Sequence, residues 1–171
     1  MTRLRIGQGF DLHRLQSADS GDRGAAEATA GVVLAGIQIP GALRVVAHSD
    51  GDVAIHALCD ALLGALALGD IGTHFSDRDP RWAGADSRRF LLAVTAMVRE
   101  QGYRVINVDV TILAEQPKIA PYARAMREAL AICIGIDVDA VSIKATTMEG
   151  LGAIGRGEAI AAQAVVLLEA Q

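Results

Sequence analysis

Apolar residues recur at spacings that change along the chain, and each change predicts a new element. Residues 4–15 alternate between apolar and polar positions, which predicts a strand. Residues 32–39 predict a second strand, and we expect the two to pair in antiparallel fashion across a long loop at 17–30. In residues 52–68, positions spaced three and four apart fall on one side of a helix, which predicts a helix there. The same reasoning predicts helices at 88–101 and 122–134 and strands at 103–114, 141–147 and 158–168.

The order of these elements predicts an α/β (α+β) fold. Helices and strands are mixed without strict alternation, and no repeat or long linker divides the chain. We therefore expect a single domain over residues 1–171, with one mixed β-sheet and helices on one face. The other sheet face would also be apolar, and such a face is expected to pack against a partner subunit.

Composition and charge narrow the class of function. The net charge of −4 gives no electrostatic support for binding nucleic acid. The uncharged apolar stretches fall well short of the ~20 residues that span a bilayer, and the first residues lack the apolar run of a signal peptide. Cys59 and Cys133 do not have the paired spacing of a zinc knuckle or a disulfide framework. We therefore expect a cytoplasmic protein that binds neither nucleic acid nor membranes.

Metal-ligating residue types gather near the start of the chain. Asp11 and His13 stand two apart on a predicted strand, so both side chains project from one face. A helix packed on that sheet could bring His56 to the same point. Two imidazoles and one carboxylate leave a coordination position open, as in catalytic zinc sites, although Mn²⁺ or another divalent ion would also fit. Each signal alone is weak, since a single Asp-x-His pair is more often a solvated edge.

The segment from His48 to Asp52 places several polar side chains directly before the predicted helix that carries His56. A polar segment beside an apolar helix indicates a functional site. Asp50 or Asp52 could instead cap the helix, where the helix dipole favours a negative charge. The two interpretations are compatible.

Three loops carry groups that suit a phosphorylated ligand. Residues 70–72 and 75–79 are acidic and indicate either binding of a second cation or sugar hydroxyls, or ordinary solvated turns. Residues 145–150 place two hydroxyls and adjacent backbone amides at a predicted strand end, which can hold phosphate oxygens. Lys118 could add one positive charge.

Six stretches of the chain then point to one family. They read IGQGFDLH, AHSDGDVAIHALCDALLGALALGDIGTHF, DPRWAGADSR, NVDVTILAEQPKIAPY, IKATTMEGLG and GRGEAI. In this order the chain resembles the 2-C-methyl-D-erythritol 2,4-cyclodiphosphate synthases over nearly its whole length. The run HSDGDVAIHALCDALLGA is the most specific of these signals.

The resemblance implies a particular reaction. It is the conversion of 4-diphosphocytidyl-2-C-methyl-D-erythritol 2-phosphate to 2-C-methyl-D-erythritol 2,4-cyclodiphosphate with release of CMP, in the non-mevalonate route to isoprenoid precursors. The reaction needs no protein nucleophile, which agrees with the lack of a Ser/His/Asp or Cys/His arrangement. The resemblance also implies a homotrimer with active sites between subunits. It implies a divalent metal ion as well, with Zn²⁺ at Asp11, His13 and His56 and Mg²⁺ or Mn²⁺ with the diphosphate.

Site residues follow from the same resemblance. Asp11, His13 and His56 would be the metal ligands, and His48 and Thr147 would stabilise the transition state. Asp70 and Gly72 would hold the methylerythritol part. Further contacts to the substrate would come from Asp11, His13, His48, Ser49, Ile71, Phe75, Ser76, Asp77, Arg78 and Asp79. The cytidine diphosphate part would be held by Ala114, Glu115, Gln116, Pro117, Lys118, Ile119, Ala120, Thr146, Thr147, Met148 and Glu149. Ala153 and Arg156 complete the implied substrate contacts.

Two other functions are compatible with the predicted metal ligands and the expected trimer. A metal-dependent phosphoesterase would use the same three ligands but would need space for an attacking water. A non-catalytic trimeric protein could bind a metal or an isoprenoid. Product analysis separates the first from a synthase, because hydrolysis incorporates solvent oxygen and cyclisation does not.

Overall fold

A five-stranded sheet with helices on one face forms the framework of the protein. The structure is a computed structural model that describes residues 3–18 and 31–171. The strands are β1 (Leu4–Ser17), β2 (Gly31–Leu34), β3 (Ile37–Pro40), β4 (Leu43–Val46), β5 (Tyr103–Leu113), β6 (Val141–Thr146) and β7 (Ala159–Ala170). The α-helices are α1 (Val53–Ala65), α2 (Ile71–His74), α3 (Arg88–Glu100), α4 (Ala123–Ile134) and α5 (Gly152–Gly155), with 3₁₀ turns at Pro80–Trp82, Ala120–Tyr122 and Val138–Ala140.

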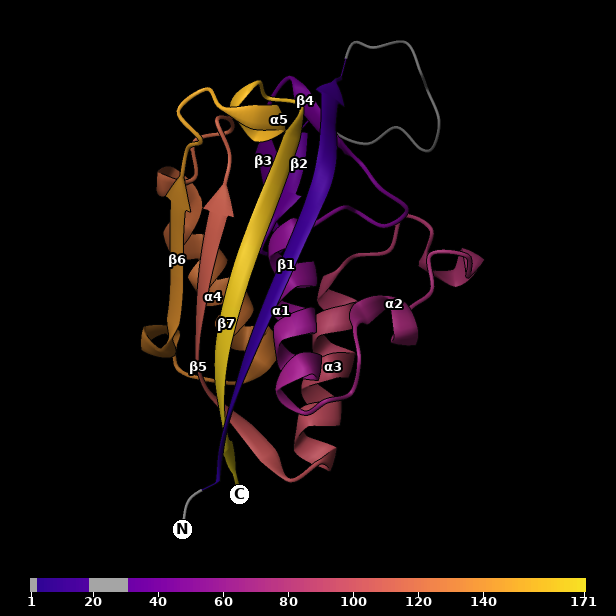
Figure 1. The fold of residues 1–171 in the computed structure, drawn as a ribbon, viewed down its shortest axis with the longest axis vertical. Coiled ribbons are helices and arrows are strands. Elements are labelled where there is room, and N and C mark those ends of the chain that lie inside the picture. The colour runs from indigo at the N-terminus through magenta and orange to yellow at the C-terminus, as the bar shows by residue number, and fades with distance from the viewer. Residues whose placement is uncertain (1–2, 19–30) are drawn as a thin grey trace.

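The sheet is mixed, as predicted. Its strand order is β4-β1-β7-β5-β6, and β5 pairs with β6 in parallel while the other neighbours are antiparallel. Helices α1 and α4 lie behind the sheet in Figure 1, with α3 packed beside α1. The single mixed α/β domain with helices on one face is therefore confirmed.

The second predicted strand is wrong as a single element. Residues 32–39 contain a hairpin, in which β2 and β3 pair with each other in a separate two-stranded sheet. The chain reverses at Ala35 and Gly36, both of which have positive φ angles. The expected pairing of this segment with β1 is also wrong, because β1 pairs instead with β7 and β4. When small residues form the turn, the alternation of apolar and polar positions does not show where the chain reverses direction.

Three short elements were not predicted, and the loop predicted at 17–30 is described only in part. The periodicity did not predict β4, α2 or α5, which span only four residues each. Ser17 belongs to β1, and the backbone N–H of Ala18 donates to the carbonyl of Ala42. The remainder of the expected loop, residues 19–30, lies outside the described residues.

Helix α1 is almost entirely buried, since it lies between the sheet and α3. It crosses β1 at Gly7 and Gly9, where Cβ atoms would lie 1.8 and 2.0 Å from backbone oxygens of the helix. Asp52 caps the helix by accepting hydrogen bonds from the backbone N–H groups of Ala54 and Ile55. Its carboxylate also accepts from the N–H groups at the β2–β3 turn, which fixes the hairpin to the start of α1.

The opposite face of the sheet is apolar along β1. Ile6, Phe10 and Leu12 expose 73%, 53% and 48% of their surface, and Val165 of β7 exposes 41%. Toward β5 and β6 this face becomes polar, where Lys144 and Asp109 form an ion pair. In the described part of the chain, none of the helices is long and apolar enough to cross a membrane.

Candidate metal centre and cleft

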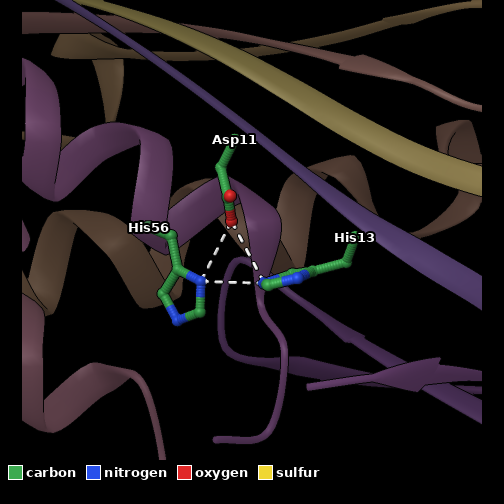
Figure 2. A group of neighbouring side chains, drawn as sticks. All are labelled: Asp11, His13 and His56. Atoms are coloured by element: carbon green, nitrogen blue, oxygen red, sulfur yellow. Dashed lines mark hydrogen bonds and ion pairs between the residues drawn. The ribbon is translucent and has the colours of Figure 1, made fainter. Parts of the chain in front are cut away.

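Three side chains converge at the edge of the sheet (Figure 2). The Nε2 atom of His13 and the Nδ1 atom of His56 lie 3.2 and 3.0 Å from one carboxylate oxygen of Asp11. The two nitrogens lie 3.1 Å from each other. Among the described residues, these three form the group of His, Cys, Asp and Glu side chains whose donor atoms are close enough to hold one metal ion. The sequence prediction that Asp11, His13 and His56 meet is confirmed.

Local structure explains the meeting of the three side chains. Asp11 and His13 occupy alternate positions of β1, on the face that also carries Gly7 and Gly9. The missing Cβ atoms let α1 approach β1 closely, and His56 stands on the first turns of that helix. The glycine contact therefore determines the distance between the helix ligand and the strand ligands.

The electrostatics favour an anionic Asp11. Its burial acts to raise the pKa, but hydrogen bonds to His13 and His56 and their charges outweigh burial and hold the pKa well below its usual range. Burial acts to lower the pKa of His56, and the hydrogen bond to Asp11 and nearby carboxylates outweigh it and raise the pKa. A divalent cation would replace these protons and favour the same anionic carboxylate.

The donor set fits a divalent transition metal. A tetrahedral zinc ion with bonds of about 2.0–2.1 Å holds its ligand atoms roughly 3.3 Å apart. The three donor atoms here are separated by 3.0–3.2 Å. Two imidazoles and one carboxylate leave one position open for substrate. The site could therefore hold a catalytic metal ion.

A cleft of about 420 Å³ opens beside this group. Predicted site residues line much of it, namely Asp11, His13, His48, Ser49, His56, Ile71, Gly72, Phe75 and Asp77. Asp60, Trp82 and Phe90 also line the cleft and were not predicted. Trp82 and Phe90 pack with Phe75 in an aromatic cluster, so one wall of the cleft is apolar.

Of the acidic residues predicted for substrate contact, Asp77 lines the cleft and Asp70 does not. Asp70 caps α2 and accepts hydrogen bonds from the backbone N–H and hydroxyl of Thr73. Asp60 instead reaches the cleft, and its carboxylate accepts from the N–H of Ile71. Its position on the same predicted helix as His56, four residues along, was the signal in the sequence that could have identified it.

The loop at 75–79 contributes Phe75 and Asp77 to the cleft, and the side chains of Ser76 and Asp79 form local hydrogen bonds. Ser76 accepts from the N–H of Arg78, and Asp79 pairs with Arg81 and caps a 3₁₀ turn. The Nε2 atom of His48 lies 3.4 Å from the carbonyl oxygen of Asp79. The loop therefore contacts the His48 ring and contributes Asp77 to the cleft lining.

The segments predicted to hold cytidine diphosphate meet at the other edge of the sheet. Ala114 donates its N–H to the carbonyl of Thr146, where β5 and β6 end in parallel. Glu115 accepts hydrogen bonds from the N–H groups of Met148 and Gly150, which joins the two segments. Thr147 donates its hydroxyl to Glu149. Neither residues 114–120 nor residues 146–149 line the cleft with His48, and β6 lies at the opposite end of the strand order from β1 and β4.

The last two predicted contacts lie after β6. Ala153 belongs to α5, and Arg156 follows that helix and forms an ion pair with Glu158. Both precede β7 in the chain, in the same connection that follows residues 146–149.

The fold and site define a small α/β protein with a mixed sheet and a candidate divalent-cation site at one edge. Comparison of the sequence specifies the class further. The chain belongs to the YgbB family, whose pattern matches residues 4–169.

Named relatives cover nearly the whole chain. A protein of Xanthomonas axonopodis pv. citri named 2-C-methyl-D-erythritol 2,4-cyclodiphosphate synthase is 53% identical over 165 residues, which are 96% of this chain and 93% of that one. The bifunctional IspDF of Campylobacter jejuni has a similar fold, with a TM-score of 0.90 and 36% identity. This chain is covered completely in that match and spans 43% of the bifunctional chain. IspF of Plasmodium falciparum, described as a CDP complex, has a TM-score of 0.82 and 32% identity, covering 98% and 97% of the two chains.

Proposed function

We propose that this protein is a 2-C-methyl-D-erythritol 2,4-cyclodiphosphate synthase. It would convert 4-diphosphocytidyl-2-C-methyl-D-erythritol 2-phosphate to the cyclic 2,4-diphosphate and CMP. The convergence of Asp11, His13 and His56 beside the cleft is the observation that carries the proposal. Relatives over nearly the full chain bear the name of this synthase, which supports it.

The reaction is an intramolecular phosphoryl transfer. An oxygen of the 2-phosphate forms a bond to the β-phosphorus, and the bond from that phosphorus to the bridging oxygen breaks, so that CMP leaves with the electron pair. The protein must fold a flexible polyanion until its two phosphates meet, and this positioning can lower the barrier by several kcal/mol, up to about 7–11. The cleft lies next to the metal ligands and has the apolar wall to hold the methylerythritol carbons.

Asp11, His13 and His56 would hold Zn²⁺, and Mg²⁺ or Mn²⁺ would accompany the diphosphate. Such cations neutralise phosphate charge and polarise phosphoryl oxygens. The three protein ligands leave one position for a substrate oxygen. No Lys or Arg is among the described residues that line the cleft, so metal ions and backbone amides suit this role.

His48 would donate a hydrogen bond to phosphate oxygens as charge builds up in the transition state. It lines the cleft, and among the described residues it stands outside the group that could share one metal ion. The attacking phosphate oxygen already carries charge at neutral pH, so no general base is required. Thr147 would act on the same charge from the nucleotide side.

We propose further that the active site is completed by a second subunit of a homotrimer. The segments 114–120 and 146–149 are joined to each other but lie at the opposite sheet edge from the cleft. The exposed apolar face along β1 gives a surface on which another copy would pack, with Ile6, Phe10 and Leu12 at its centre. This arrangement would bring the nucleotide segments of one subunit to the cleft of the next. We expect the enzyme in the cytoplasm.

Product analysis tests the proposed activity. The purified protein would be supplied with the nucleotide substrate and Mg²⁺ or Mn²⁺ in water enriched in ¹⁸O. Cyclisation yields CMP and the cyclic diphosphate in equal amounts, and neither product gains ¹⁸O during the reaction. A linear product that contains ¹⁸O would identify a phosphoesterase, and the absence of any turnover would contradict both activities.

A further inference from the structure

Ser87 stands at the start of α3 but does not cap that helix. Serine is among the preferred N-cap residues because its hydroxyl can satisfy a free backbone N–H of the first turn. At Ser87 the side chain makes no such bond, although the residue is fully buried. Its hydroxyl lies instead between Asp50 and His56, residues from the loop before α1 and from α1 itself. The Ser87 hydroxyl therefore contacts a candidate metal ligand instead of the backbone of α3.

The direction of the hydrogen bonds around Ser87 follows from Asp50. An ionised carboxylate can only accept hydrogen bonds. One oxygen of Asp50 lies 2.9 Å from the backbone nitrogen of Ser87, and the other lies 2.5 Å from its hydroxyl oxygen. The hydroxyl proton of Ser87 therefore points to Asp50, and a lone pair of the same oxygen is left for His56.

The His56 ring is the group that can donate a hydrogen bond to this lone pair of Ser87. The Nε2 atom of His56 lies 2.9 Å from the hydroxyl oxygen of Ser87. Because Ser87 already donates its proton to Asp50, Nε2 must carry a hydrogen and donate. In a neutral imidazole the other nitrogen then has the free lone pair. That nitrogen is Nδ1, which faces Asp11 and His13. When the ring is protonated, Nδ1–H donates to Asp11, and this is the proton that the ring loses at alkaline pH or on binding a metal ion.

We propose that Asp50 and Ser87 are positioning residues that hold His56 in the Nε2–H tautomer, with Nδ1 prepared to bind the metal ion. The inference rests on the metal site of the proposed function and deepens it. Ligating histidines commonly donate their second ring N–H to such a partner, and removal of the partner typically lowers metal affinity 10–100-fold. We call the hydrogen bonds from Asp50 through Ser87 to His56 the relay. It joins the loop before α1, the start of α3 and α1 itself, and Asp50 and Ser87 are 37 residues apart in the chain. It couples the packing of α3 to the orientation of a ligand on α1.

A second hydroxyl near the same nitrogen makes a weaker contact. Ser49 lies 3.3 Å from Nε2 and accepts from the backbone N–H of Gly51. The Ser49 oxygen is farther from Nε2 than the Ser87 oxygen is. Among the hydrogen bonds of the described residues, none between the Ser49 hydroxyl and Asp50 defines where the Ser49 proton points. Ser87 is therefore the residue that specifies the tautomer.

The first experiment reads the tautomer directly. Long-range ¹H–¹⁵N correlation spectra of metal-free protein at alkaline pH distinguish a protonated Nε2 from a protonated Nδ1. We expect Nε2–H at His56 in the wild type. In Asp50→Asn the amide can give its oxygen to the Ser87 N–H and its NH₂ to the Ser87 hydroxyl, which then donates to Nε2. We therefore expect that variant to shift His56 toward the Nδ1–H tautomer, as amide substitutions beside other orienting carboxylates do.

The second experiment measures Zn²⁺ affinity by competition with a chromophoric chelator. Ser87→Ala and Asp50→Asn should each bind Zn²⁺ about 10–100-fold more weakly than the wild type. Ser87→Thr, which keeps the hydroxyl, should recover most of the affinity. His56→Ala gives the value for a lost ligand, and Ser142→Ala, at an exposed serine of β6, controls for removal of a hydroxyl.

The outcomes distinguish this inference from the proposed function. Wild-type Zn²⁺ affinity together with an unchanged tautomer in folded Ser87→Ala and Asp50→Asn would overturn the relay alone. If Ser87→Ala does not fold, Asp50→Asn and Ser87→Thr decide the question by the same two readouts. A wild-type protein that binds no Zn²⁺ and shows Nδ1–H at His56 would overturn both the relay and the metal site.

Discussion

Gly9 on β1 lies so close to α1 that a Cβ atom in its place would come within 2.0 Å of the carbonyl oxygen of Ala57. Ala57 directly follows His56, and Gly9 stands two residues before Asp11 on the same strand face. The contact therefore links the packing of the helix to the geometry of the candidate metal centre. A side chain at this position must push the helix away from the strand, because both contacting groups are backbone.

Gly9→Ala should accordingly damage both stability and metal binding. Overpacking of this kind typically costs about 1–3 kcal/mol of unfolding free energy, and the displaced helix would also carry His56 away from the strand ligands. Chemical denaturation and Zn²⁺ competition measure the two effects. Gly41→Ala is the matched control, since a Cβ there would meet no atom within 4 Å. Equal stability and metal affinity for the two variants would contradict the argument.

Metal removal should give the protein a characteristic pH dependence. In the metal-free protein the pKa of His56 is raised, because the hydrogen bond to Asp11 and nearby carboxylates outweigh the opposing effect of burial. The folded state thus holds this proton more tightly than the unfolded state, whose histidine pKa is about 6.5. The resulting stabilisation is fully present below that value and is lost as the pH rises through the folded pKa.

Thermal melting of chelator-treated protein between mildly acidic and alkaline pH measures this effect. We expect the melting temperature to fall with rising pH in the wild type and to fall less in His56→Gln, which cannot titrate. Zn²⁺ affinity should change in the opposite direction, since the ligands must lose protons to bind. An identical pH slope in both proteins would exclude His56 as the group responsible.

His48→Ala tests the mechanism. The variant should keep the fold and the metal ion and lose turnover by on the order of 10²-fold, as expected for one lost hydrogen-bond donor to the transition state. His48→Asn and His48→Gln retain an N–H donor and should recover part of the rate. Steady-state kinetics and metal analysis separate the possibilities. Loss of metal from His48→Ala would make His48 a ligand, and an unchanged rate would leave it without a chemical role.

Mixed subunits test whether active sites are shared. Asp11→Ala damages the metal half and Thr147→Val the nucleotide half, so each variant alone should be nearly inactive. If each site combines halves of two subunits, random trimers from an equal mixture should regain about a quarter of the wild-type rate. Each variant mixed with wild type provides the reference for subunit exchange. A stable, fully active monomer in sedimentation would defeat the shared-site proposal.

Much of the candidate site was predictable because its signals are local. Alternation along β1 puts Asp11 and His13 on one face, and the helical repeat of α1 puts His56 on its buried side. The resemblance assigned residues 114–120 and 146–149 to one part of the ligand, and the structure joins the two segments through Glu115 and the N–H of Met148. The relay of Asp50 and Ser87 was not predicted, because a serine before a helix is ordinarily explained as a cap.

The sequence by itself determined the kinds of element and the family resemblance, since periodicity and motif spacing are properties of consecutive residues. Only the tertiary structure decided that β1 pairs with β7, more than a hundred residues later, and that residues 32–39 fold back as a hairpin. It likewise decided that Asp60 lines the cleft while Asp70 caps a helix. The physical reason is that strand pairing and burial depend on contacts between distant segments, and local patterns constrain those contacts only weakly.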